Sequence, residues 1–297
     1  MLHATPTAAD KRAAFRTALS SGKLQRFPGA FNPLTAKLIE RHGFDGVYIS
    51  GAVLSAELGL PDIGLTTATE VAGRSQQIAR VTALPALVDA DTGFGEPMNA
   101  ARTVQLLEDA GVAGMHLEDQ VNPKRCGHLD GKDVVDRATA VRRIKAAVQA
   151  RRDPNFVIAA RTDAKAVHGI EETIDRAKEF ADAGADLLFP EAMTDAADFA
   201  RLRAAVDIPI LANMTEFGKS ELLDTGTLES AGVNLVIYPV TLLRLALHAA
   251  EEGLRTISGQ GTQSSLLDRM QHRRDLYELL DYSAYSVFDQ NVFNFRG

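Results

Sequence analysis

Residues 86–118 read ALVDADTGFGEPMNAARTVQLLEDAGVAGMHLE, and this stretch predicts a strand, a helix and a second strand. The short apolar runs Ala86–Asp89 and Gly114–Glu118 have the length and composition of buried strands. Between them, Asn99–Ala110 has a helical pattern and ends at Gly111, where a helix C-cap is expected. Strands and helices that alternate in this way are the repeating unit of a parallel sheet.

The same alternation runs through most of the chain. We predict eight strands, at Phe27–Phe31, Gly46–Ser50, Ala86–Asp89, Gly114–Glu118, Phe156–Arg161, Leu187–Glu191, Ile210–Asn213 and Leu235–Tyr238. Further helices are predicted at Arg137–Ala150, Glu171–Ala183 and Ala196–Ala205, with C-caps at Gly43, Gly184 and Gly232. Eight such units favour an α/β fold of the (β/α)₈ TIM-barrel type over an open sheet, and no glycine-rich nucleotide-binding motif follows a strand.

The pattern changes past residue 253. We expect residues 1–297 to form a single barrel domain and about 253–297 to form a C-terminal helical arm. A helix is predicted at roughly Ser264–Leu280. It leads into a tail whose aromatic side chains need a surface to cover, either on their own barrel or on a neighbouring subunit; these are Tyr282, Tyr285, Phe288, Phe293 and Phe295.

Composition narrows the class of protein. Hydrophobic residues make up 45% of the chain and charged residues 24%, which is an ordinary balance for a globular domain with a large core. The net charge of −7 and the lack of a basic stripe argue against nucleic acid as a partner. The most apolar stretch, 233–250, is broken by polar residues, so we expect no membrane association. One cysteine and no signal-peptide pattern favour the cytoplasm.

Polar side chains follow six of the eight predicted strands. In a barrel the carboxyl ends of the strands form the active-site face, so these residues predict an active-site rim. The strand ends read Tyr48–Gly51, Asp89–Asp91, His116–Asp119, Arg161–Asp163, Glu191 and Asn213–Thr215.

Asp89 and Asp91 are two residues apart at one strand end, so their side chains should point the same way. Neighbouring carboxylates repel one another unless a cation neutralises them, and Mg²⁺ commonly binds one or two carboxylates and keeps several waters. Glu118, on the next strand, could join directly or through water. The alternative is structural: Asp91 would open a turn at Thr92 and Gly93, and Asp89 would cap a neighbouring helix.

The segment Gln120–Asp133 is long and polar for a connection between elements, which suits a loop over an active site. It contains Cys126, close to Lys124, Arg125 and His128. Nearby cations lower the pKa of a thiol, so such a cysteine could exchange a proton near neutral pH. An exposed thiol without a role and a redox sensor are the alternatives.

Three arginines are candidates for binding a substrate with several carboxylates, because guanidinium pairs with them in bidentate fashion. Arg161 ends a strand, whereas Arg244 and Arg273 lie in helical patterns and by spacing alone favour surface ion pairs. His116, alone on an apolar strand, is interpreted as a core histidine with satisfied hydrogen bonds, and Met193 and Met214 as core residues.

Five motifs together resemble the 2-methylisocitrate lyase family of the isocitrate lyase and phosphoenolpyruvate mutase superfamily. They are KRCGH at 124–128, VDADTGFG at 88–95, EDQ at 118–120, ARTDA at 160–164 and LFPEA at 188–192, and the similarity extends over about residues 25–280. The family commonly has Ser-Gly-Gly where this chain has Ser50, Gly51 and Ala52.

The resemblance implies a carbon–carbon lyase with Mg²⁺ as cofactor, for which Mn²⁺ is the alternative. Asp89 and Asp91 would hold the metal ion, with Glu118 and Asp62 in or near its coordination shell. The family forms tetramers with C-terminal helices swapped between neighbours, which would give the aromatic tail a use. The implied substrate-binding residues are Ser50, Gly51, Ala52, Cys126, Gly127, Arg161, Glu191, Asn213, Thr215, Arg244 and Arg273.

The implied reaction is cleavage of 2-methylisocitrate, a tricarboxylate, to pyruvate and succinate in the methylcitrate cycle of propionate catabolism. Cys126 would protonate the succinate carbanion, whose charge Arg161 and His128 would stabilise. Lys124, in the same loop motif, belongs to the predicted catalytic set. Either Tyr48 or a hydroxide on the metal ion would remove the hydroxyl proton.

Two other enzymes and one other class remain as alternatives. Isocitrate lyases usually carry KKCGH, whereas this chain has Arg125, so we favour the methylated substrate; a dimethylmalate lyase is disfavoured. A barrel kept only as a binding or scaffold protein would be expected to have lost part of the rim. Asp89, Asp91, Cys126 and Arg161 are all present.

Overall fold

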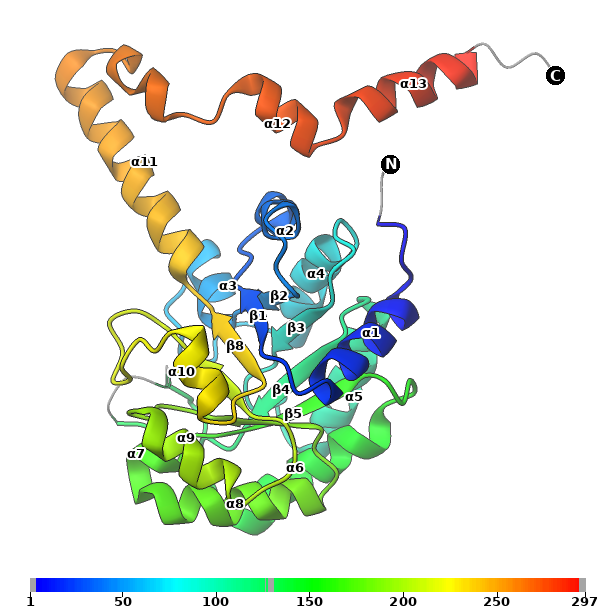
Figure 1. Cartoon of the computed structure of the whole chain (residues 1–297), viewed down its shortest axis with the longest axis vertical. Helices are drawn as coiled ribbons and strands as arrows, with labels where there is room; N and C mark the ends of the chain where they lie inside the picture. The colour runs from blue at the N-terminus through cyan, green and yellow to red at the C-terminus, as the bar shows by residue number, and fades with distance from the viewer. Residues whose placement is uncertain (1–3, 126, 128–130, 294–297) are drawn as a thin grey trace.

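Eight parallel strands close into a barrel in the computed structural model, which describes residues 4–125, 127 and 131–293 (Figure 1). Strands β2 to β6 pair in chain order, β8 pairs with β1 and β7, and the bridges Gly29–Tyr48 and Leu188–Ile210 join the two groups. The predicted barrel is therefore confirmed. The strands are β1 (Gln25–Pro28), β2 (Val47–Ile49), β3 (Ala86–Asp89), β4 (Gly114–Glu118), β5 (Val157–Thr162), β6 (Leu187–Pro190), β7 (Leu211–Asn213) and β8 (Leu235–Tyr238).

Helices alternate with the strands and surround the barrel. Gly43, Gly111, Gly184 and Gly232 follow helices with positive φ angles, as expected for C-caps. Short helices α3 (Gly51–Glu57) and α7 (Ala164–His168) follow β2 and β5. The surrounding helices are α2 (Pro33–Arg41), α4 (Ala68–Ala79), α5 (Pro97–Asp109), α6 (Arg137–Ala150), α8 (Ile170–Asp182), α9 (Ala196–Arg203) and α10 (Thr225–Ser230).

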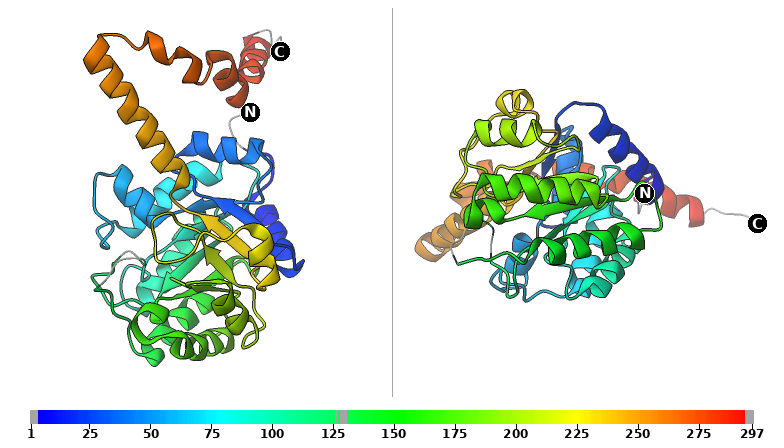
Figure 2. Two further views of the ribbon diagram at one scale, coloured as in Figure 1. Left: turned by 60° about the vertical axis from the view of Figure 1, so that its left-hand side comes forward. Right: turned by 90° about the horizontal axis from the view of Figure 1, so that it is seen from below.

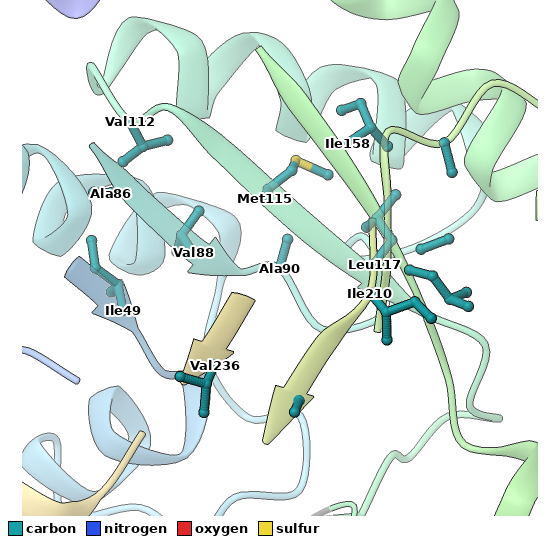
Figure 3. Packing of buried hydrophobic residues seen from close by; sticks show 14 of the residues in the cluster. Ile49, Ala86, Val88, Ala90, Val112, Met115, Leu117, Ile158, Ile210 and Val236 are labelled. Carbon is teal, nitrogen blue, oxygen red and sulfur yellow. The ribbon is translucent and has the colours of Figure 1, made fainter. Parts of the chain in front are cut away.

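The hydrophobic core has two layers because neighbouring residues of a strand face opposite sides of the sheet. Leu87 of β3 belongs to the cluster inside the barrel, together with Phe27 and Phe189. Val88, the next residue, belongs to the cluster between the strands and the helices, with Met115 and Ile158 (Figure 3). This alternation decides which residues of each strand point toward the barrel axis.

Helix α1 (Ala8–Ser20) packs against the amino-terminal ends of the strands. The Lys11 ammonium donates to the carbonyl oxygens of Ala79 and Thr82, ahead of β3, and Arg12 donates to that of Val112, ahead of β4. Phe15 meets Phe27 inside the barrel, with ring centroids 5.2 Å apart. One end of the barrel is thus closed, and the carboxyl ends of the strands remain available for a site.

The C-terminal segment leaves the barrel. Helix α11 (Thr241–Gln260) projects outward, and the chain then turns so that α12 (Arg273–Leu279) and α13 (Tyr282–Phe293) run across above the barrel (Figures 1 and 2). Glu278 of α12 lies 3.6 Å from Arg41 of α2. None of the α11 side chains is buried. The single helix predicted at Ser264–Leu280 is wrong: Met270 is extended and separates a 3₁₀ helix, Ser264–Arg269, from α12. No helix in the described part of the chain is long and apolar enough to cross a membrane.

A groove of about 650 Å³ lies at the base of α11. Its lining is mainly apolar and comes from α2, α10, β8 and the first turns of α11, with Leu38, Phe44 and Tyr238 among the contributors. In a regular barrel the last helix packs back between its neighbours. Here α11 does not fold back, so the groove is left uncovered within one chain.

Candidate active site

Polar residues at the carboxyl ends of the strands point inward because they continue the inward-facing positions. Asp89 lies two residues after Leu87, and Glu191 two residues after Phe189, so each side chain extends the inner layer toward the rim. A small pocket of about 50 Å³ lies there. Its lining residues are Tyr48, Ser50, Ala52, Asp62, Asp89, Lys124, Gly127, Arg161, Glu191, Asn213, Thr215, Pro239 and Val240.

Two kinds of segment line the pocket. Lys124 and Gly127 come from the segment between β4 and α6, whereas most of the other lining residues follow strands. Lys124 and Gly127 therefore meet the strand-end residues at the rim.

Asp89 is fixed by backbone N–H groups on both of its carboxylate oxygens. The Asp91 N–H donates to Oδ1 at 3.0 Å, and the Gly51 N–H donates to Oδ2 at 3.2 Å. Gly51 opens α3, so the interpretation of Asp89 as a helix cap is partly correct and is compatible with a metal site. Asp91 has a φ of 46°, an unusual value for a non-glycine residue and a feature common at functional sites.

Lys124 is the cation nearest to the second carboxylate of the pair. Its ammonium lies 2.7 Å from Oδ1 of Asp91 and 2.5 Å from Oδ1 of Asp62. The side chain of Lys124 is almost completely buried, and these acidic neighbours hold its pKa well above the usual value despite burial. Lys124 thus stays charged and neutralises part of the acidic cluster.

The two carboxylates of the pair, Asp89 and Asp91, differ in pKa. Burial acts to raise the pKa of Asp89, but the positive charges around it and the N–H of Asp91 lower it to about 2. Burial and the negative charge of Asp89 raise the pKa of Asp91 to about 6. Burial also raises the pKa of Glu118 well above its usual value. These carboxylates therefore lie where additional positive charge would be stabilising.

A divalent cation fits this donor set. Among the described residues, the buried oxygens Oδ1 of Asp91 and Oε1 and Oε2 of Glu118 lack a hydrogen bond, although each residue has an ion pair. No three His, Cys, Asp or Glu side chains of the described segments converge into a complete metal site. Mg²⁺ does not need one, because it usually binds one or two carboxylates and keeps its other ligands as water.

Arg161 also lines the pocket and is held by three carboxylates. Its guanidinium pairs with Asp163 at 3.0 Å, Glu118 at 3.3 Å and Glu191 at 3.2 Å, and it lies over the ring of Phe189 at 5.1 Å. Asn213 donates to Glu191 at 3.3 Å. Arg161 is therefore held in one orientation before any substrate binds.

Tyr48 and His116 form a pair below the carboxylates. The prediction that His116 is a core histidine is confirmed, but its hydrogen bonds are only partly satisfied: Nε2 bonds to the Tyr48 hydroxyl, and Nδ1 has no partner among the described residues. Met193 and Met214 are core residues, as predicted.

Three residues to which the sequence analysis gave no individual role support Arg161. Asp163 bridges Arg161 and Lys132, and Asp119 accepts hydrogen bonds from the Asp163 N–H and from Arg176. Asp119 and Asp163 could have been suspected from their places in the EDQ and ARTDA motifs. Arg176 lies in α8 with nothing in its local sequence to mark it.

Some predicted site residues lie elsewhere. Arg244 bonds to the carbonyl and carboxylate of Glu216 and stacks on Phe217, beside the pocket but outside its lining. Arg273 begins α12 in the outward arm, so the structure does not bring it to the pocket of its own chain. Cys126 and His128 lie outside the described residues. Gly127, between them, does line the pocket.

Comparison with known proteins agrees with this site. Residues 15–258 match the family model of phosphoenolpyruvate phosphomutase. A probable 2-methylisocitrate lyase 2 of Corynebacterium glutamicum is 64% identical over 286 residues, covering 96% of this chain and 93% of that protein. The chain belongs to the phosphoenolpyruvate mutase and isocitrate lyase superfamily. Within this superfamily, the 2-methylisocitrate lyase of Escherichia coli is 45% identical, covering 94% of this chain and 95% of that protein.

Solved structures of the same superfamily share the fold. A structure of oxaloacetate acetylhydrolase with an inhibitor has a TM-score of 0.90 at 32% identity and covers 98% of this chain and 99% of its own. A structure of 2,3-dimethylmalate lyase has a TM-score of 0.88 at 33% identity and covers 98% of both chains. The predicted resemblance and the predicted class, a carbon–carbon lyase of this superfamily, are confirmed.

Proposed function

We propose that this chain is a Mg²⁺-dependent lyase that cleaves 2-methylisocitrate to pyruvate and succinate, in propionate catabolism. The observation that carries the proposal is one pocket lined both by Asp89, whose neighbour Asp91 donates its N–H to it, and by the fixed guanidinium of Arg161. The names of two similar relatives support this substrate. The complete rim argues against a barrel kept only for binding.

Asp89 and Asp91 would hold the metal ion, with Asp62 and Glu118 near it. Bound Mg²⁺ supplies a Lewis acid for the oxygen on which negative charge develops. Lys124 shares Asp91 and Asp62 with this site, so the ammonium and the cation draw on the same carboxylates. Lys124 therefore limits the negative charge that the carboxylates present to an anionic substrate.

We assign Arg161, Asn213 and Thr215, which line the pocket, to the part of the substrate that leaves as succinate. A charged guanidinium with neutral donors stabilises the carboxylate charge that develops there. Cys126 and His128 flank Gly127 in sequence, and we assign Cys126 the delivery of a proton to the carbanion. Burial raises the pKa of Tyr48 well above its usual value, so the phenol retains its proton and is suited to donating a hydrogen bond, which argues against Tyr48 as the base that removes the hydroxyl proton.

Ser50, Gly51 and Ala52 begin α3 and lie beside the carboxylate pair. We assign them to the keto-acid half of the substrate. With Arg161 and Tyr48 in the pocket lining, Cys126 and His128 on either side of Gly127 in sequence would complete the proposed catalytic set.

The decisive experiment compares kcat/KM for 2-methylisocitrate and isocitrate with Mg²⁺ present, detecting pyruvate and glyoxylate separately. We expect a strong preference for the methylated substrate. One methyl group contributes only about 1–3 kcal/mol of pocket contact, so slow turnover of isocitrate is compatible with the proposal. A preference for isocitrate would retain the metal and cysteine assignments and refute the substrate. Turnover of 2,3-dimethylmalate or oxaloacetate alone would assign the chain to the activity of a structural relative.

We further propose that the chain assembles as a homotetramer in which C-terminal arms pack on neighbouring barrels. Leu254 of α11 and Phe288 of α13 are largely exposed, and the groove at the base of α11 is apolar. Exposed apolar surface of this extent is typical of an interface between subunits. In such an assembly Arg273 could approach only the site of a neighbouring chain, and its assignment to substrate binding remains a prediction.

A further inference from the structure

Lys132 is buried although it belongs to a polar surface segment. Its side chain is only 3% exposed, and its ammonium lies 2.6 Å from Oδ1 of Asp163, a residue that is completely buried. The same ammonium also donates a hydrogen bond to the carbonyl oxygen of Gly127. A buried lysine with two acceptors in different parts of the chain connects those parts.

The first acceptor, Asp163, holds an arginine that lines the pocket. Asp163 accepts from Nε of Arg161 at 3.0 Å and from Nη2 at 3.3 Å, which fixes the plane of the guanidinium. Asp163 is itself held by its N–H, which donates to Asp119 at 2.9 Å. Lys132 therefore adds its charge to a carboxylate that already orients Arg161.

The second acceptor lies directly over the same arginine. A Cβ atom placed on Gly127 would meet Nη2 of Arg161 and Cγ of Glu191, both at 2.5 Å. The Gly127 backbone is therefore in close contact with the pair and has no room to move toward it. Lys132 prevents the opposite movement, because it binds the Gly127 carbonyl to Asp163.

We infer that Lys132 is a positioning residue that holds the Gly127 backbone over Arg161, through Asp163, and so sets the shape of the pocket where the substrate's carboxylate binds. The inference rests on the proposed function for its substrate. It also has consequences for catalysis, because Gly127 is covalently joined to Cys126 and His128. A displacement of about 1 Å in such a segment is enough to cost a large factor in rate.

Lysine suits this role better than other side chains. An ammonium has three donors on a flexible stem, so it can serve a carboxylate and a carbonyl at once. Lys132→Met keeps the length of the side chain and removes both interactions. Lys165→Met is the matched control: Lys165 pairs with Asp198 at 2.8 Å, is mostly buried and does not line the pocket.

The test has two readouts. We expect Lys132→Met to raise KM for 2-methylisocitrate by at least about tenfold, while Lys165→Met stays within about twofold of wild type. We also expect faster hydrogen exchange at the backbone amides of residues 121–125 and 131–134 in Lys132→Met than in wild type or the control. If Lys132→Met does not fold, Lys132→Gln, which keeps N–H donors but no charge, is measured in the same way.

Each outcome decides one point. A Lys132→Met protein with lower Tm but unchanged KM would show a merely structural ion pair and overturn the inference. Unchanged hydrogen exchange would overturn the anchoring of Gly127. Restoration of KM to within about threefold by Lys132→Arg, which keeps a cationic donor, would support it. If wild-type protein cleaves none of the substrates, the proposed function fails, whereas the hydrogen-exchange comparison still tests the anchoring.

Discussion

Tyr48 and His116 form a hydrogen bond of 2.8 Å between the phenol and Nε2, inside the barrel and directly beneath the acidic pair. Their rings are nearly parallel, with centroids 5.9 Å apart, and Nε2 lies 3.7 Å from Oδ1 of Asp89. Burial lowers the pKa of His116 to about 4, so the imidazole is neutral at neutral pH and carries one ring proton. His116 thus links the orientation of the Tyr48 hydroxyl to the inner layer of the core.

Removing the Tyr48 hydroxyl should affect both activity and stability. We expect Tyr48→Phe to lower kcat by about 100-fold or more, a typical loss for a positioned proton donor or acceptor. It should also lower the free energy of unfolding by about 1–3 kcal/mol, because Nε2 of His116 loses its buried partner. Steady-state kinetics and urea unfolding measure the two effects. Tyr238→Phe is the control, because Tyr238 lines the groove at the base of α11 and not the pocket. Equal losses of activity in both variants would contradict the assignment of Tyr48.

Asp91→Asn should abolish Mg²⁺ binding and, with it, activity. In wild type, Mg²⁺ at 100 times its Kd should stabilise the folded protein by about 2.7 kcal/mol, seen as a rise in Tm. We expect the variant to lose both this rise and its activity, because one of the two carboxylates proposed to bind the ion is gone. Calorimetric titration with MgCl₂ gives the affinity directly. Wild-type Mg²⁺ affinity in Asp91→Asn would refute the metal site.

Gly51→Ala tests how closely α3 approaches the acidic pair. The added Cβ would lie 2.8 Å from Oδ2 of Asp89, so the carboxylate must shift, and we expect Mg²⁺ affinity to fall at least about tenfold. Gly73→Ala in α4 is the control, because its Cβ would meet no atom within 4 Å. That change should stabilise the protein by roughly 0.5–1 kcal/mol, as expected for alanine in place of glycine in a helix. Unchanged metal binding in Gly51→Ala would show that Asp89 is not held as described.

Cys126→Ser tests proton delivery. A serine hydroxyl is a much weaker acid than a thiol, so we expect kcat to fall by orders of magnitude while substrate binding survives. Isothermal titration of the variant with succinate separates binding from turnover. Turnover near that of wild type would exclude Cys126 as the proton donor.

Leu254→Glu tests assembly through the arm. Leu254 is 68% exposed on α11, and a charge there would have to be desolvated in an interface between subunits. We expect light scattering to detect smaller species than for wild type. Leu65→Glu changes an exposed leucine outside the arm and should leave the mass unchanged. An equal mass for wild type and Leu254→Glu would exclude α11 from the interface.

Local sequence patterns predict the barrel well because each strand buries a short apolar run and four of the helices around the barrel are followed by a glycine. The strands at Ala86–Asp89, Gly114–Glu118 and Leu235–Tyr238 are predicted to the residue. The first strand is not: it begins at Gln25, where the backbone pairs with Leu235, and backbone pairing leaves no mark in the hydrophobic pattern. The break at Met270 was missed for a related reason, since no glycine or proline interrupts Ser264–Leu280.

The site was predictable where polar residues end strands, and less so where distant segments meet. Asp89 and Arg161 follow from their places in the strand pattern. Lys132 and Arg176 do not, because an ordinary lysine in a polar segment and an arginine in a helix become functional only through partners 31 and 57 residues away. Arg244 and Arg273 show the reverse: motif resemblance places them in the site, and the single chain does not.

Helix α11 has a consequence for how this protein responds to dilution. Its 20 residues bury no side chain within their own chain, so an isolated copy offers little to offset the conformational entropy lost when the helix forms. The folding of this helix then depends on association with another copy of the chain, and therefore on protein concentration. Thermal midpoints should rise with protein concentration, and solutions at nanomolar concentration should lose structure first at the C-terminal end.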